Sequence, residues 1–210
     1  MMTDLPMFPV RRLLICASGG ISSSLLPGWL CWLHMSFNDF TVRVALTKAA
    51  QQFVTPRALA VLSRHETFLD TAVSNSAAVT HVELAEWAEA VVVAPATVNL
   101  IGKLANGIAD DLVTTVLATA RCPIVIAPSL PSGATDNPAL RRNLATLRAD
   151  GYGIVPTANG ISASSGESTT HCMAHAPSVV AYLRRHLTSL GYVSRFDEPT
   201  RTNTSDLTGA

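Results

Sequence analysis

Five short runs of mostly apolar residues constrain the fold of this chain more than any other feature of its sequence. Each run ends at small or turn-forming residues, and segments with a helical pattern separate one run from the next. Continuous apolar runs of this length are typical of strands that are buried on both faces of a parallel sheet. The runs occupy residues 11–17, 41–47, 90–95, 123–128 and 152–156.

The alternation of strands and helices predicts a single-domain α/β fold over residues 11–190, a flavodoxin-like or Rossmann-like doubly wound parallel sheet. Right-handed crossovers favour the strand order 2-1-3-4-5. One helix should begin with Thr55 as its N-cap and Pro56 in its first turn. The polar tail, residues 194–210, is expected to be disordered. Helices are expected at residues 22–35, 56–64, 82–88, 99–120 (with a break near Gly107), 138–150 and 176–187.

The composition excludes several classes of protein. Hydrophobic residues make up 48% of the chain and charged residues 14%, and the formal net charge is zero. No cluster of Lys and Arg indicates a nucleic-acid partner. No apolar stretch reaches the roughly 18–20 residues that span a membrane, and the N-terminus lacks a signal-peptide layout, so we expect a cytoplasmic protein without a membrane partner. The high apolar content suggests burial against other subunits.

The four cysteines, Cys16, Cys31, Cys122 and Cys172, form neither a C-x-x-C pair nor a zinc-binding spacing. The sequence therefore predicts no disulfide framework.

Ligands of such sheets bind beyond the carboxyl ends of the strands. In this chain each of these exits is small, rich in hydroxyl groups and almost uncharged, so backbone N–H groups could approach a ligand closely. The first exit contains Ser18, Gly19, Gly20 and Ser22, followed by a helix. This arrangement favours a phosphate, although an ordinary strand-to-helix turn has the same composition. The loop matches neither G-x-G-x-x-G nor a P-loop.

Histidines supply two further candidates. His81 should lie at or near the N-cap of the helix at 82–88, where it could be a catalytic base or a structural residue. His171 and His175 would form a metal-binding pair if helical, but Pro177 follows closely and the glutamate of H-E-x-x-H is missing. We therefore predict no metal site. The chain also lacks a G-x-S-x-G serine-hydrolase elbow.

Together these segments resemble the homo-oligomeric flavin-containing cysteine decarboxylases. The segment "HVELAEWAEAVVVAPATVNLIGKLANGIADDLVTT" is similar to the core of that family, including a histidine ahead of a P-A-S/T-A-N-T motif. The turn "ASGGIS" and the second exit "LTKAAQQFV" also fit. The resemblance covers about residues 11–187 and implies that FMN is the cofactor.

The resemblance also implies roles for particular residues. The FMN phosphate would lie near Ser18, Gly19, Gly20 and Ser22. The motif loop would hold FMN through Pro95, Ala96, Thr97 and Asn99, and Thr47 and Phe53 would line the flavin site. His81 would act as a base or orient the substrate thiol. The family builds this site between the subunits of a homotrimer, often assembled further into a homododecamer.

Two departures from the family pattern bear on the substrate. The family places P-x-M-N-x-x-M-W after the fourth strand, and its Asn contacts the substrate carboxylate; that position is Pro131 here. The phosphopantothenoylcysteine decarboxylases carry A-C-G-D in a late lid, where this chain has Ser164, Ser165, Gly166 and Glu167. Serine cannot perform thiol redox chemistry.

The lid therefore resembles that of the lanthipeptide-type peptidyl-cysteine decarboxylases. This resemblance implies oxidative decarboxylation of the C-terminal cysteine of a ribosomally made precursor peptide. The product would be an aminoenethiol for aminovinyl-cysteine formation, in a pathway of antibiotic biosynthesis.

Three alternatives remain open. A phosphopantothenoylcysteine decarboxylase of coenzyme A synthesis would release a reduced thiol. A flavin prenyltransferase would need basic residues for a dimethylallyl phosphate, for which Arg141, Arg142 and Arg148 are the candidates. A non-catalytic flavoprotein subunit would bind FMN without turnover.

Overall fold

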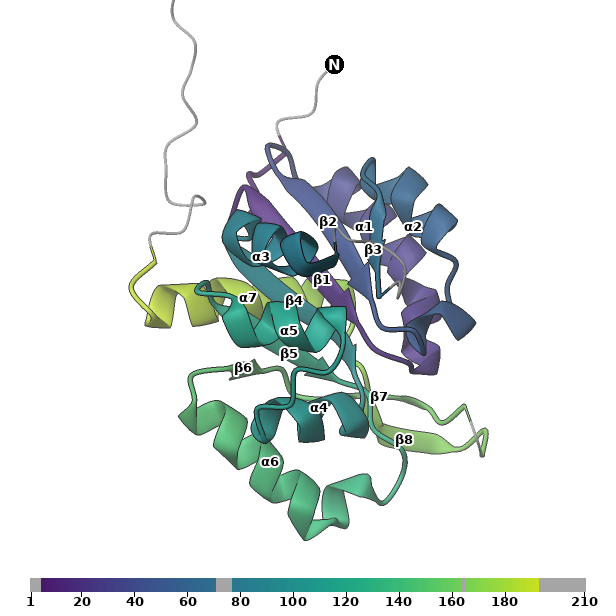
Figure 1. Ribbon diagram of the computed structural model, residues 1–210. Coiled ribbons are helices and arrows are strands. Elements are labelled where there is room, and N and C mark those ends of the chain that lie inside the picture. The colour runs from purple at the N-terminus through teal and green to yellow at the C-terminus, as the bar shows by residue number, and fades with distance from the viewer. Residues whose placement is uncertain (1–4, 71–76, 164, 193–210) are drawn as a thin grey trace, which may run out of the picture.

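A sheet of six parallel strands, in the order β3-β2-β1-β4-β5-β6, forms the centre of the structure (Figure 1). The computed structural model describes residues 5–70, 77–163 and 165–192. The predicted tail at 194–210 lies outside these residues. The strands are β1 (Arg12–Ala17), β2 (Thr41–Leu46), β3 (Thr67–Leu69), β4 (Ala90–Ala96), β5 (Ile124–Pro128) and β6 (Gly153–Ile154).

The doubly wound parallel fold is confirmed. The five predicted strands correspond to β1, β2, β4, β5 and β6, and they adjoin one another in the predicted order. The sixth strand, β3, was not predicted. It is only three residues long and half-buried, so it lacks the apolar run that marks the others.

Helices cover both faces of the sheet (Figure 1). Successive side chains of β1 point to opposite faces of the sheet, and both faces are apolar. Leu13 and Ile15 belong to one hydrophobic core, while Leu14 and Cys16 belong to the other. The first core is completed by α1 (Leu26–Ser36), α2 (Pro56–Ser63) and α7 (Ala176–Ser189). The second is completed by α3 (Ala77–Trp87), α4 (Val98–Ala105), α5 (Leu112–Thr119) and α6 (Pro138–Ala149).

The helix boundaries follow from local capping. Thr55 caps α2 as predicted, because its side chain accepts a hydrogen bond from Ala58 N at 3.3 Å and Pro56 occupies the first turn. The expected break near Gly107 separates α4 from α5. A capping box between Asp111 and Thr114 starts α5.

A two-stranded antiparallel hairpin, β7 (Ala158–Ile161) and β8 (Ser168–Cys172), extends from the sheet before α7 (Figure 1). It was not predicted, since its sequence is short and polar. Its tip includes Ser165 and Gly166 of the expected lid. None of the described helices is long and apolar enough to cross a membrane.

Candidate active site

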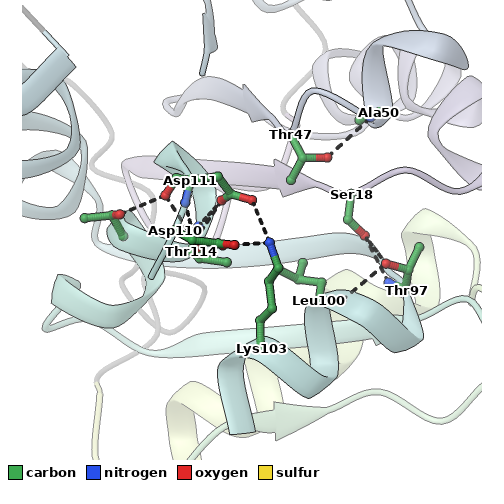
Figure 2. A network of polar contacts seen from close by, with 10 residues as sticks. Ser18, Thr47, Ala50, Thr97, Leu100, Lys103, Asp110, Asp111 and Thr114 are labelled. Atoms are coloured by element: carbon green, nitrogen blue, oxygen red, sulfur yellow. Dashed lines mark hydrogen bonds and ion pairs between the residues drawn. The ribbon is translucent and has the colours of Figure 1, made fainter. Parts of the chain in front are cut away.

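A hydrogen-bonded link joins the exits of β1 and β4, which lie side by side in the sheet. The Ser18 hydroxyl donates to the Pro95 carbonyl at 2.8 Å and accepts from the Thr97 backbone N–H at 3.0 Å. The Ser18 backbone N–H donates to the same carbonyl at 3.1 Å. Figure 2 shows Ser18 directed at Thr97 from the neighbouring strand. Because Ser18 is buried, this link fixes the two loops as one unit.

A cavity of about 670 Å³ opens in front of this link, within the range typical of small-molecule sites. Its walls come from the β1 exit, the start of α4, the β5 exit, the β7–β8 hairpin and the segment before α7. In its wall, the hydroxyls of Ser22 and Ser129 form a hydrogen bond of 2.9 Å that joins the β1 and β5 exits. Five predicted cofactor-binding residues line this cavity: Gly19, Gly20, Ser22, Thr97 and Asn99.

The other predicted cofactor-binding residues lie outside the cavity wall. Ser18, Pro95 and Ala96 support it from behind, as parts of the buried link and of β4. Thr47 and Phe53 follow β2. The Thr47 hydroxyl accepts a hydrogen bond from Ala50 N at 3.3 Å, whereas the Phe53 ring is partly exposed.

Gly19 explains how the exits of β1 and β2 come together. A Cβ atom at this position would overlap the Ala49 side chain and come within 3.0 Å of the Ala49 carbonyl carbon. A glycine is therefore required for the close approach of the two loops.

The cavity lining is neutral and amphipathic. Among the described residues that line it, none is Asp, Glu, Lys or Arg. Large apolar side chains stand beside the hydroxyls, and Ile21, Leu25 and Ile161 are 53%, 49% and 63% exposed. Such a wall fits FMN, because apolar side chains suit an aromatic ring system and backbone N–H groups with hydroxyls suit a phosphate.

His81, the predicted catalytic residue, does not line this cavity. The helix that carries it begins at Ala77, so His81 is inside α3 and the expectation of an N-cap position is wrong. Alanine is a strong helix former, and two alanines extend the helix toward the N-terminus. His81 lines a second cavity of about 630 Å³ together with Asp110 and Asp111. This cavity shares no lining residue with the first.

Two acidic residues of the second cavity, Asp110 and Asp111, form ion pairs with Lys103 (Figure 2). Lys103 Nζ lies 2.6 Å from Asp110 Oδ1 and 3.6 Å from Asp111 Oδ2. The hydrogen bond from Lys103 lowers the pKa of the Asp110 carboxyl, and the same bond raises the pKa of Lys103. Asp110 thus remains ionised near neutral pH.

Two of the three predicted lid residues can be placed relative to the cavity. Ser164 lies outside the described residues. Ser165 and Gly166 sit in the hairpin tip, where Ser162 N donates to Glu167 O at 2.8 Å, and neither lines the cavity. Gly166 has a φ of 72°, which favours glycine in this turn.

The cavity wall also contains Ser129, Asn159, His171 and His175, to which sequence reasoning gave no role in cofactor binding. Ser129 directly follows a strand, so its position carried a signal. His171 lies in β8 and His175 caps α7, so the segment between them is not helical and the spacing of a helical metal pair does not apply. The described residues contain no group of three or more His, Cys, Asp or Glu side chains arranged for a metal ion. Arg141, Arg142 and Arg148 lie on α6, away from the cavity wall.

Comparison with known proteins agrees with the cavity chemistry. A family model described as "Flavoprotein" matches residues 6–188, so the chain belongs to this flavoprotein family. The structure of TvaF, an FMN-dependent cysteine decarboxylase from thioviridamide biosynthesis, is 40% identical in sequence, with a TM-score of 0.65 over 69% of this chain and 88% of TvaF. SpaF, another FMN-dependent cysteine decarboxylase, is 30% identical, with a TM-score of 0.70 over 85% of this chain and 98% of SpaF.

Within the flavoproteins, the chain thus falls among the flavin-dependent cysteine decarboxylases. A curated relative is the coenzyme A biosynthesis bifunctional protein CoaBC of Bacillus subtilis (strain 168), which is 41% identical over 151 residues. The match covers 71% of this chain and 37% of CoaBC. The chain therefore spans little more than a third of that relative.

Proposed function

We propose that this chain catalyses the FMN-dependent decarboxylation of a cysteine at the end of its substrate. The observation that carries this proposal is the neutral, hydroxyl-lined cavity at the strand exits of a chain 40% identical to an FMN-dependent cysteine decarboxylase. Bound FMN would supply the two-electron oxidation that lets the carboxylate leave as CO2.

The chain's own residues would hold and enclose the reactants. Gly19, Gly20 and Ser22 would hold the cofactor phosphate, and Thr97 and Asn99 would hold the rest of the cofactor. The β7–β8 hairpin would cover the substrate and exclude water.

A second copy of the chain would complete the site. The cavity of about 670 Å³ in which FMN would bind is the flavin cavity. His81, the proposed base, lines a separate cavity. Large apolar side chains such as Ile21 and Ile161 are exposed beside the flavin cavity. Both observations support assembly into a homotrimer or homododecamer in which His81 of one copy faces the flavin cavity of another.

Two substrates are candidates. The serine at position 165, where a redox-active cysteine would stand, favours a peptide with a C-terminal cysteine, because the enethiol would be released unreduced. The relative from thioviridamide biosynthesis is consistent with this substrate.

The second candidate is phosphopantothenoylcysteine. It is favoured by the 41% identity to CoaBC of Bacillus subtilis. Of the two substrates, this is the one that the curated relatives support more directly.

The deciding experiment is an absorption spectrum of the purified chain followed by product mass. A flavin spectrum is expected. If a peptide is the substrate, a cysteine-terminated peptide should lose one CO2 and two hydrogens. With phosphopantothenoylcysteine, the coenzyme A reaction predicts the loss of CO2 alone. A colourless, monomeric preparation that does not take up added FMN would contradict the proposal.

A further inference from the structure

The flavin cavity must hold anions although its wall is almost devoid of charge. A cofactor phosphate and a substrate carboxylate would both enter it. Among the described residues of its wall, only His171 and His175 can carry a positive charge. His171 lies in β8, the second strand of the hairpin, and His175 lies at the start of α7.

His171 lies beside the β5 exit. The Leu130 backbone N–H donates to the His171 carbonyl at 3.1 Å, which ties β8 to the loop that contains Pro131. Pro131 carries no side-chain donor and no backbone N–H, so it can give a carboxylate no hydrogen bond. The imidazole of His171 thus enters the cavity wall next to the position that lacks a donor.

His175 lies at the start of α7, a helix of 14 residues. Its backbone carbonyl accepts from Val179 N at 3.1 Å, and its imidazole makes no capping hydrogen bond. The positive end of the helix dipole adds to the attraction of an anion at this point.

We propose that His171 and His175 bind the carboxylate of the substrate's terminal cysteine, in the role that Pro131 cannot fill. This inference rests on the proposed function and extends it to substrate recognition. Each imidazole would donate one N–H to a carboxylate oxygen, and protonation would strengthen both hydrogen bonds.

The test measures binding rather than turnover. Two ligands are titrated into the protein by calorimetry. One is a hexapeptide that ends in serine, and the other is phosphopantothenoylserine. Each is used both as the free acid and as the C-terminal amide. Serine replaces cysteine so that no reaction follows. The wild type should bind at least one acid more tightly than its amide. The double variant His171→Gln, His175→Gln should reduce that preference roughly tenfold to a hundredfold, with FMN content unchanged. Each single variant should reduce it in part.

His65→Gln is the matched control. His65 is exposed in the turn after α2 and lies outside the cavity, so both the preference and the FMN content should stay at wild-type values.

Three results would overturn the inference: no preference for an acid in the wild type, an unchanged preference in the double variant, or a double variant that loses FMN while keeping the preference. The last result would assign the imidazoles to the cofactor phosphate. Failure of the proposed function is recognised separately, because it appears as a wild-type protein that binds no FMN or releases no CO2 from cysteine-terminated substrates.

Discussion

The hydroxyl of Ser18 accepts a hydrogen bond from the backbone N–H of Thr97 at 3.0 Å, and this contact connects residues that are 79 positions apart in the sequence. Thr97 is also the N-cap of α4, where its side chain accepts from Leu100 N at 3.5 Å. One serine therefore sets both the shape of the flavin cavity and the starting point of a helix that forms part of its wall.

Replacing Ser18 with alanine should destabilise the protein. The Thr97 N–H would lose its partner in a part-buried location, at a cost of about 1–3 kcal/mol in the free energy of unfolding. FMN should also dissociate more readily. Urea denaturation and flavin retention measure the two effects. Ser189→Ala removes an exposed hydroxyl on α7 and should change stability by less than about 0.5 kcal/mol.

Two glycine-to-alanine variants should act in opposite directions. Gly19→Ala would force the β1 and β2 exits apart, because the new methyl group overlaps Ala49, at a cost of about 1–3 kcal/mol. Gly28 lies within α1 with no atom within 4 Å of an added Cβ, so Gly28→Ala should stabilise by about 0.5–1 kcal/mol. Equal effects in thermal unfolding would contradict the packing argument.

Asp111 should contribute to stability through its cap. Its carboxylate accepts from Thr114 N at 2.7 Å and from the Thr114 hydroxyl at 2.8 Å. Asp111→Ala should lower the free energy of unfolding by about 1 kcal/mol. Asp111→Asn keeps an acceptor and should retain most of that stability in denaturant titrations. A cost as large for Asn as for Ala would assign the effect to charge instead.

His186 should make folding stability depend on pH. Burial lowers its pKa, and its Nε2 atom is buried without a hydrogen-bond partner among the described residues. The unfolded chain, with a histidine pKa of about 6.5, therefore binds the proton more readily. The free energy of unfolding should fall as the pH drops below about 6.5.

The variant His186→Gln should flatten this decrease when unfolding is measured at about pH 7.5 and pH 5.5. Some decrease should remain, because burial also lowers the pKa of His34. The same slope in the variant and the wild type would show that His186 is not responsible.

Mixing two inactive variants should restore activity if neighbouring copies share each site. His81→Ala should keep its flavin absorbance but lose turnover, and Asn99→Ala should damage the flavin cavity. After dissociation and reassembly, roughly a quarter of the sites should pair an intact His81 with an intact flavin cavity. Native mass spectrometry would verify the mixing. Mixed oligomers without activity would mean that each copy uses its own His81.

Much of the fold followed from the sequence because buried parallel strands leave continuous apolar runs. Five strands, their order and the Thr55 cap were predicted for this reason. The strand at 67–69 was too short to leave such a run, and the hairpin at 158–172 is too polar.

The candidate site was predicted in part. Gly19, Gly20, Ser22, Thr97 and Asn99 meet at one cavity because strand exits meet at one edge of a parallel sheet. His171 and His175 reach that cavity through hairpin geometry, for which the sequence carried no periodic signal. The position of His81 depends on where α3 begins.

The two outermost strands have a consequence for assembly. The edge strands of the six-stranded sheet are short: β3 has three residues and β6 has two. Neither edge therefore offers a row of free backbone groups long enough to pair with another chain. Copies of this protein should therefore meet through helices and loops. Growth by strand addition, which leads to open-ended fibres, is blocked at both ends of the sheet.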